Sequence, residues 1–129
     1  MVDLSVMPLA TLMGIRLVEA SPDFVAAEMP VRPDLCTAGR ILHGGAHMAL
    51  ADTIGAVATV LNLPPGARTT TVESKTNFIG AIREGEVARA ECRPIHKGKT
   101  TMVWQTSILR PDGKLAAVVT QTQLVLPAG

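Results

Sequence analysis

Residues 42–62 read LHGGAHMALADTIGAVATVLN, and this stretch decides the fold. It holds no proline, carries Ala, Met and Leu early, and is followed by Pro64-Pro65-Gly66, a sequence that ends helices. We predict a helix over Ala46–Asn62, whose 17 residues would span about 25 Å. Because this helix would be apolar nearly all round, we expect it to be buried.

The rest of the chain carries strand patterns. Alternating or β-branched runs bounded by turn residues predict strands over residues 15–20, 24–31, 67–79, 86–96, 101–110 and 115–126. In the third of these, one set of residues alternates against another: Val72, Ser74, Thr76 and Phe78 against Thr71, Glu73, Lys75 and Asn77. A short helix is predicted at Pro8–Met13, because proline suits a first helical turn and Gly14 suits the position just past the end.

These elements predict an α+β fold in a single domain over residues 1–129. We expect the first two strands to pair and the last four to form an antiparallel meander. The long helix must be covered, and a curved antiparallel sheet wrapped around it is the simplest way to do so.

The composition excludes several classes of protein. Apolar residues make up 47% of the 129 and charged residues 18%, which suits a packed core and not a disordered chain. The net charge is only +1 and aromatic residues make up 2%, so neither nucleic acid nor an anionic membrane surface is an expected partner.

The cysteines and the apolar segments predict a cytoplasmic protein. Cys36 and Cys92 belong to no metal-binding spacing and predict free thiols, with a disulfide as the alternative. The first residues lack the basic region of a signal peptide. Residues 46–63 contain too many polar side chains for a membrane span.

The start of the long helix is the strongest candidate site. Gly44 and Gly45 would leave free N–H groups at a helix N-terminus, where a ligand can approach closely and an anion or oxyanion is favoured. Asp52 follows on the same apolar helix and is the only carboxylate between Asp34 and Glu73. Burial of an ionised carboxylate is costly unless it is paired or used in chemistry. Asp52 is therefore either a functional group or a buried structural aspartate.

His43 and His47 are four residues apart, a spacing that can hold a metal when both lie on a helix. The glycines between them place His43 before the helix, and no third ligand is evident, so we expect no metal site. Each histidine alone is more often a structural residue than a catalyst.

The basic turn Lys97-Gly98-Lys99 is a second candidate site. Gly98-Lys99-Thr100 is similar to the end of a phosphate-binding P-loop, but Arg93 stands where that motif needs its first glycine. The segment also joins two strands, which excludes a P-loop nucleotide triphosphatase. The turn can meet phosphate groups through its charges, or be a solvated turn without a ligand.

The order of these motifs resembles a known family. The segments PLATLMGIRLVEA, GRILHGGAHMALADTIGAVA, TTTVESKTNFIGAIREG and HKGKTTMVWQTSI resemble hotdog-fold acyl-CoA thioesterases, of the branch similar to the phenylacetate-pathway thioesterases. The resemblance runs from Pro8 to Leu126. It implies a helix wrapped by an antiparallel sheet, homodimers with a continuous sheet that often pair into homotetramers, an acyl-CoA substrate and no cofactor.

The resemblance also implies roles for individual residues. Asp52 matches the catalytic carboxylate, which acts as general base or as nucleophile, and the Gly44 N–H matches the oxyanion donor. Thr71 matches a hydroxyl that helps to hold the water or the carboxylate, and His43 matches the histidine of the HGG motif and is a candidate catalytic residue. Four further positions match residues that meet the substrate or coenzyme A: Gly45, Lys97, Gly98 and Lys99. In the family, the carboxylate and the HGG loop come from different subunits.

One position departs from the family pattern. Thr37 stands six residues before His43, where this branch usually carries Asn or Gln to position the attacking water or the carbonyl. The threonine side chain is shorter and would need a bridging water.

We therefore predict an acyl-CoA thioester hydrolase and leave two alternatives open. One is a hydratase or dehydratase of acyl chains on the same fold, and the other is a non-catalytic acyl-CoA-binding module. The scarcity of aromatic residues favours an aliphatic or small acyl group.

Overall fold

A computed structural model describes residues 2–129, and Met1, where the predicted domain begins, lies outside the described residues. Helix α1 spans Pro8–Met13 and α2 spans Gly44–Val60, with short 3-10 turns at Leu4–Val6 and Pro33–Leu35. The strands are β1 (Arg16–Ser21), β2 (Phe24–Pro30), β3 (Arg68–Phe78), β4 (Val87–Lys97), β5 (Thr101–Leu109) and β6 (Leu115–Leu126). Every predicted helix and strand is present, with ends that differ by at most two residues.

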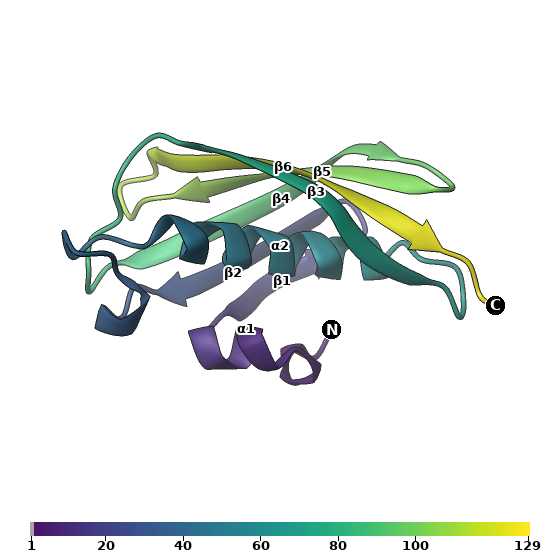
Figure 1. The fold of residues 1–129 in the computed structure, drawn as a ribbon, viewed down its shortest axis with the longest axis horizontal. Helices are drawn as coiled ribbons and strands as arrows, with labels where there is room; N and C mark the ends of the chain where they lie inside the picture. The colour runs from purple at the N-terminus through teal and green to yellow at the C-terminus, as the bar shows by residue number, and fades with distance from the viewer. Residues whose placement is uncertain (1) are drawn as a thin grey trace.

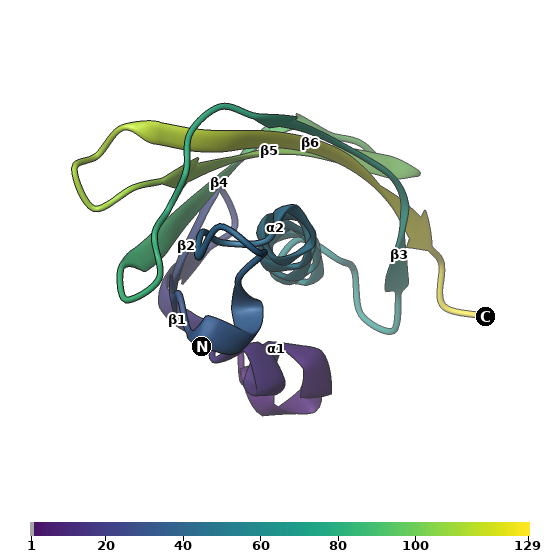
Figure 2. The same ribbon diagram turned by 60° about the vertical axis from the view of Figure 1, so that its left-hand side comes forward.

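The strands form one antiparallel sheet in the order β1-β2-β4-β5-β6-β3. Figure 1 shows α2 lying along this sheet, and the turned view in Figure 2 shows the sheet arching around α2, with α1 on the open side of the arch. The predicted α+β class, a long helix wrapped by a curved antiparallel sheet, is confirmed.

The predicted four-stranded meander is wrong in the place of β3. Strands β4, β5 and β6 are successive neighbours, but β3 pairs with β6 at the edge of the sheet, and β4 pairs with β2. Strand β4 carries the small buried residues Ala88, Ala90 and Cys92, which suit the middle of the sheet. Strand β3 instead directs hydroxyl side chains to the inner face of the sheet. Periodicity predicts strands but not their neighbours, so the crossing from β3 to β4 was not visible in the pattern.

Helix α2 begins two residues earlier than predicted, at Gly44. His43 is its N-cap: the imidazole Nδ1 accepts a hydrogen bond of 2.8 Å from the Gly45 N–H. The prediction that His43 lies before the helix is confirmed. The earlier start follows from this cap, because an imidazole satisfies a terminal N–H in the way that Ser, Thr, Asp or Asn does at most helix starts.

The sheet covers α2 on one side only. Leu50 and Ile54 face the sheet and are fully buried, but Met48, Asp52 and Val60 are exposed along the opposite side of the helix. The prediction of a buried helix is therefore confirmed for the side that faces the sheet and wrong for the side that carries Met48, Asp52 and Val60. Within residues 2–129, no helix is long and apolar enough to cross a membrane.

The indole of Trp104 joins the sheet to α2 in the core. The Trp104 side chain on β5 is fully buried, and its Nε1–H donates to Thr59 Oγ1 on α2 at 2.9 Å. The Thr59 hydroxyl in turn donates to the Gly55 carbonyl at 2.8 Å, so each polar atom of this contact has a partner. A buried donor needs such an acceptor, because leaving it unpaired costs stability.

We expect Thr59→Val to lower the free energy of unfolding by about 1–3 kcal/mol, because the indole N–H loses its acceptor while the side-chain volume is kept. Thr53→Val is the matched control, since among residues 2–129 the Thr53 hydroxyl bonds to the Ala49 carbonyl within the same helix and to no strand. Urea unfolding of both variants at one protein concentration measures the difference. Equal losses in the two variants would contradict this account of the Trp104 contact.

Candidate active site

Asp52 lies in the middle of α2, where side chains from two strands reach it. Thr71 Oγ1 on β3 donates to Asp52 Oδ1 at 2.6 Å, and Gln121 Nε2 on β6 donates to the same oxygen at 3.1 Å. Asp52 Oδ2 makes no hydrogen bond within the described residues, and the side chain is exposed. The carboxylate is thus anchored through one oxygen and presents the other at the surface.

The exposure of Asp52 corrects the expectation that this carboxylate is buried. Asp52 points from the side of α2 that the sheet leaves uncovered, next to the edge strand β3. Its partner Thr71 is half-buried and its partner Gln121 is fully buried. The carboxylate is therefore hydrogen-bonded on the side that faces the sheet and exposed on the other side. A single chain therefore gives Asp52 its anchor but not a closed site.

A β-bulge in β3 aims Thr71 at Asp52. The register of β3 against β6 shifts between Thr71 and Glu73, which pairs Thr71 with Gln123 and Ser74 with Gln121. Residues 71 and 74 would point to opposite faces of a regular strand, but the extra residue brings both to the face that packs on α2. The predicted alternation, with Thr71 opposed to Ser74, is therefore wrong at this point.

The Thr71 hydroxyl lies between two acceptors. Thr71 Oγ1 contacts Gln123 Oε1 as well as Asp52 Oδ1, and it carries one proton. The proton goes to Asp52, because an ionised acceptor binds it more strongly than a neutral amide oxygen does.

The glutamines of β6 are site residues that the sequence reasoning missed. Gln121 and Gln123 are fully buried, and Gln123 Nε2 donates to Thr69 Oγ1 at 3.2 Å. One signal in the sequence could have found them. Side chains alternate between the two faces of the strand Leu115–Leu126, which puts both glutamines on the same inner face as the buried Val119. A buried polar side chain at an inward position needs partners, and here these include the candidate catalytic carboxylate.

The N-terminus of α2 supplies one free backbone donor. The Gly44 N–H has no acceptor within residues 2–129, whereas the Gly45 N–H is used by the His43 cap. Gly44 also allows close packing, since a side-chain Cβ there would lie 3.1 Å from Cζ of Phe78. Of the two predicted backbone donors, the structure leaves Gly44 available to a ligand.

Gly44 and Asp52 are too far apart to act on one atom within a single chain. Eight residues of helix separate them, which is about 12 Å along the axis of α2. An oxyanion donor and the reacting carboxylate must both reach the same carbonyl group. The structure therefore brings Thr71 to Asp52, but it does not bring the Gly44 donor to them.

Thr37 lies outside this cluster. It opens the turn before α2, where its N–H donates to the Ile41 carbonyl at 2.9 Å and its carbonyl accepts from the Arg40 N–H at 3.0 Å. The Thr37 side chain is exposed, and in the described part of the chain its hydroxyl bonds neither to Asp52 nor to Gly44.

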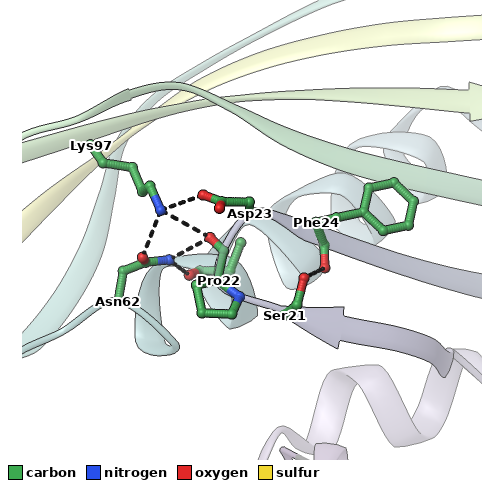
Figure 3. A network of polar contacts seen from close by, with 7 residues as sticks. Ser21, Pro22, Asp23, Phe24, Asn62 and Lys97 are labelled. Carbon is green, nitrogen blue, oxygen red and sulfur yellow. Dashed lines mark hydrogen bonds and ion pairs between the residues drawn. The ribbon is translucent and has the colours of Figure 1, made fainter.

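The predicted phosphate-binding lysine Lys97 is part of a structural network (Figure 3). Its Nζ contacts an Asp23 carboxylate oxygen, the Pro22 carbonyl at 3.5 Å and Asn62 Oδ1 at 3.1 Å. Asn62 Nδ2 completes the network with bonds of 2.8 Å to the Pro22 and Ala58 carbonyls. This network ties the turn between β1 and β2 to the end of β4 at the C-terminal end of α2.

Lys99 is the more available cation of the basic turn. It is exposed, and residues 2–129 give it no ion pair or hydrogen bond. Gly98 is required by the tight turn, since a Cβ there would lie 2.4 Å from His96 Nε2 and 2.8 Å from the Thr101 carbonyl oxygen. The turn sits at the opposite end of α2 from Gly44, about 25 Å away along the helix.

A mostly apolar cavity of about 410 Å³ opens between α1 and the first turns of α2. Its walls include His43 and Gly45, which flank the free Gly44 N–H. The apolar lining comes from Leu9, Leu12, Met13, Leu35, Ala46 and Ala49. The cavity thus lies beside the backbone donor and contains no aromatic side chain other than the His43 imidazole.

His47 is buried and packs edge-to-face on Phe78, with ring centres 5.8 Å apart. Its Nδ1 has no partner in the described residues, and burial lowers the pKa of the imidazole from 6.5 to about 4. His43 is used as the helix cap, so the two histidines have separate structural tasks. No group of three His, Cys, Asp or Glu side chains in residues 2–129 is placed to hold a metal ion.

Comparisons with known proteins identify the family. The model of the thioesterase superfamily matches residues 39–117. The chain is 33% identical over 114 residues to 1,4-dihydroxy-2-naphthoyl-CoA hydrolase from Escherichia coli, covering 88% of this chain and 83% of that protein. A mutant thioesterase from Pseudomonas aeruginosa has the same fold with a TM-score of 0.89 and 29% identity, over 98% of this chain and 95% of the other.

The PaaI protein from the phenylacetic acid degradation operon of Escherichia coli also shares the fold. Its TM-score is 0.87 at 22% identity, over 94% of this chain and 86% of that one. The chain belongs to the thioesterase superfamily and has the hotdog fold, as the motifs predicted. It is an enzyme of the thioester hydrolase class.

We expect the buried His47 to make the protein less stable in acid. Between pH 6.5 and 4, the unfolded state binds a proton at this imidazole and the folded state does not, so stability is lost as the pH falls through this window. The loss at pH 4 would be about 3 kcal/mol relative to a chain without this group. His47→Leu should remove this part of the loss, and His96→Gln, at an exposed histidine, should keep it.

Urea unfolding at pH 7 and at pH 4, at a fixed protein concentration, measures both variants against wild type. The same acid loss in His47→Leu as in wild type would contradict the role given to His47.

Proposed function

We propose that this protein hydrolyses acyl-CoA thioesters, with Asp52 as the reacting carboxylate and the Gly44 N–H as the oxyanion donor. The observation that carries the proposal is the environment of Asp52: Thr71 and Gln121 donate hydrogen bonds to Oδ1, Oδ2 has no hydrogen-bond partner within residues 2–129, and the side chain is exposed. The relative that hydrolyses a naphthoyl-CoA thioester supports a coenzyme A thioester as substrate. The two free cysteines suit a reducing compartment and support a cytoplasmic location.

Thioester hydrolysis needs a group that takes a proton from water and a donor that stabilises the negative charge on the carbonyl oxygen. Asp52 Oδ2 takes a proton from water as the water oxygen attacks the thioester carbonyl. The carbonyl oxygen becomes an oxyanion, which accepts a hydrogen bond from the Gly44 N–H. The intermediate then expels the coenzyme A thiolate, which takes the proton from Asp52, and the free acid remains. Direct attack by Oδ2, followed by hydrolysis of the mixed anhydride, uses the same groups.

Two copies of the chain must combine to make one site. If two α2 helices pack antiparallel with their twofold axis near Met48, Asp52 of one copy comes level with Gly44 of the other, which removes the separation of about 12 Å. The exposed side chain of Met48 supplies apolar surface at the centre of this contact.

The edge of the sheet supports the same dimer. Strand β3 has 11 residues and, in the part of the chain that the structure describes, pairs with β6 alone. It leaves Val72, Phe78 and the adjoining Ile79 more than half exposed. An unpaired edge with apolar side chains favours pairing with another strand, here the β3 of a second copy, and would continue the sheet across the dimer. The homotetramer that the resemblance implies stays a prediction, which light scattering can test.

The ends of the substrate fit two further features. We place the acyl group in the apolar cavity between α1 and α2, beside Gly44, and its aliphatic lining favours an aliphatic acyl chain. Lys99 lies in the turn beyond the C-terminal end of the α2 helix that supplies Asp52, and that helix end is about 12 Å past the carboxylate. Phosphates at the end of the long coenzyme A arm would meet Lys99 there, with Lys97 and Gly98 shaping the turn.

Thiol release from a panel of aliphatic and aryl acyl-CoAs tests the proposal. We expect turnover by wild type, a fall in kcat of about 10²–10⁴-fold in Asp52→Asn, and a fall of about 10²–10³-fold in Gly44→Pro. Proline is accepted at the first position of a helix, so Gly44→Pro removes the N–H without breaking α2.

Gly44→Ala is the matched control, because it adds the same Cβ against Phe78 but keeps the N–H, and it should retain most of the activity. Full activity in Asp52→Asn would refute the role of the carboxylate. Binding of acyl-CoA without thiol release would favour the binding module, and water addition to an enoyl-CoA would favour the hydratase.

A further inference from the structure

We infer that Gln121 is a positioning residue for Asp52, and that it sets which carboxylate oxygen reacts. The inference rests on the proposed function, since it concerns the same carboxylate. Gln121 comes from β6, 69 residues away in the chain, and neither the sequence motifs nor the similarity to known thioesterases assigns it a role.

The contacts of Gln121 fix the orientation of its amide. Its Nε2 carries two protons, one donated to Asp52 Oδ1 at 3.1 Å and the other to Gln123 Oε1 at 3.3 Å. Turning the amide over would place Gln121 Oε1 against two acceptor oxygens. The side chain is fully buried, so it cannot relax into solvent. Gln121 is therefore a rigid donor aimed at one oxygen of Asp52.

Two donors on the same oxygen make the carboxylate asymmetric. Thr71 and Gln121 both donate to Oδ1, which fixes the side-chain rotamer and leaves Oδ2 as the oxygen that faces the substrate side. With Thr71 alone, the carboxylate could pivot about a single hydrogen bond. The second donor removes this freedom, and a fixed reacting atom is what a productive approach to the thioester carbonyl requires.

Two features around Gln121 lower the stability of the fold. Gln121 Oε1 is buried without a partner in the described residues, which is unfavourable. A Cβ on Gly55 would lie 2.4 Å from the Gln121 amide, so α2 carries a glycine in its interior, where glycine weakens a helix. Features that lower stability at the same point are typical of functional sites.

Gln121→Met tests the inference because it keeps the volume and removes the donor. We expect kcat to fall about 10- to 100-fold with KM little changed, and the melting temperature to stay within a few degrees of wild type. Gln105→Met is the matched control, since Gln105 is an exposed glutamine on the neighbouring strand β5, and it should leave kcat unchanged.

Combination with Asp52→Asn separates positioning from an independent effect. In the Asp52→Asn background, Gln121→Met should cause no further loss, because the residue acts through the carboxylate. Wild-type kcat in Gln121→Met would overturn the inference, as would a further 10- to 100-fold loss in the double variant. Full activity in Asp52→Asn alone would instead refute the proposed function.

Gly55→Ala gives a second test if Gln121→Met does not fold. The added Cβ forces the Gln121 amide away from its place while the helix gains a better helix-forming residue. We expect the same fall in kcat as in Gln121→Met. A folded Gly55→Ala protein with wild-type kcat would overturn the inference.

Discussion

The rigidity of α2 constrains the whole site. A helix rises by about 1.5 Å per residue, so the eight residues from Gly44 to Asp52 hold the backbone donor and the carboxylate about 12 Å apart. The sheet wraps one side of this helix and leaves the side with Asp52 open. An enzyme that needs both groups at one carbonyl must therefore take them from two chains, and the uncovered helix face and sheet edge are the surfaces on which two chains would meet.

The hydrogen bonds that hold Asp52 come in part from the C-terminal strand of the chain. The β-bulge in β3 turns Thr71 toward the carboxylate, and β6 brings Gln121 to the same oxygen. Because β3 pairs with β6 and not with β4, these two strands form a common polar wall against α2. The same strand order leaves β3 at the edge of the sheet, so the arrangement that anchors Asp52 also exposes the edge on which we propose that a second copy packs.

Local sequence signals predicted the secondary-structure elements well, because proline, glycine and alternation marked every strand and helix. The LHGG segment and Asp52 mark the candidate site, and their catalytic roles stay a prediction. What the sequence did not show was long-range: that β3 lies beside β6, and that a bulge at Thr71 reverses the alternation. Gln121 was missed for the same reason, since its partner Asp52 is 69 residues away. The exposure of Asp52 was missed because an apolar helix looks buried whether its own sheet or a second chain covers it.

The most direct test of the shared site mixes two variants that each have a strongly reduced kcat. Asp52→Asn and Gly44→Pro subunits, unfolded together and refolded at equal amounts, would form mixed dimers in which one of the two sites has an intact Asp52 and an intact Gly44. Random pairing then restores about one quarter of wild-type thioesterase activity, although each variant alone keeps only about one hundredth of that activity or less. No recovery, with mixed dimers demonstrated by mass spectrometry, would contradict a site built from two chains.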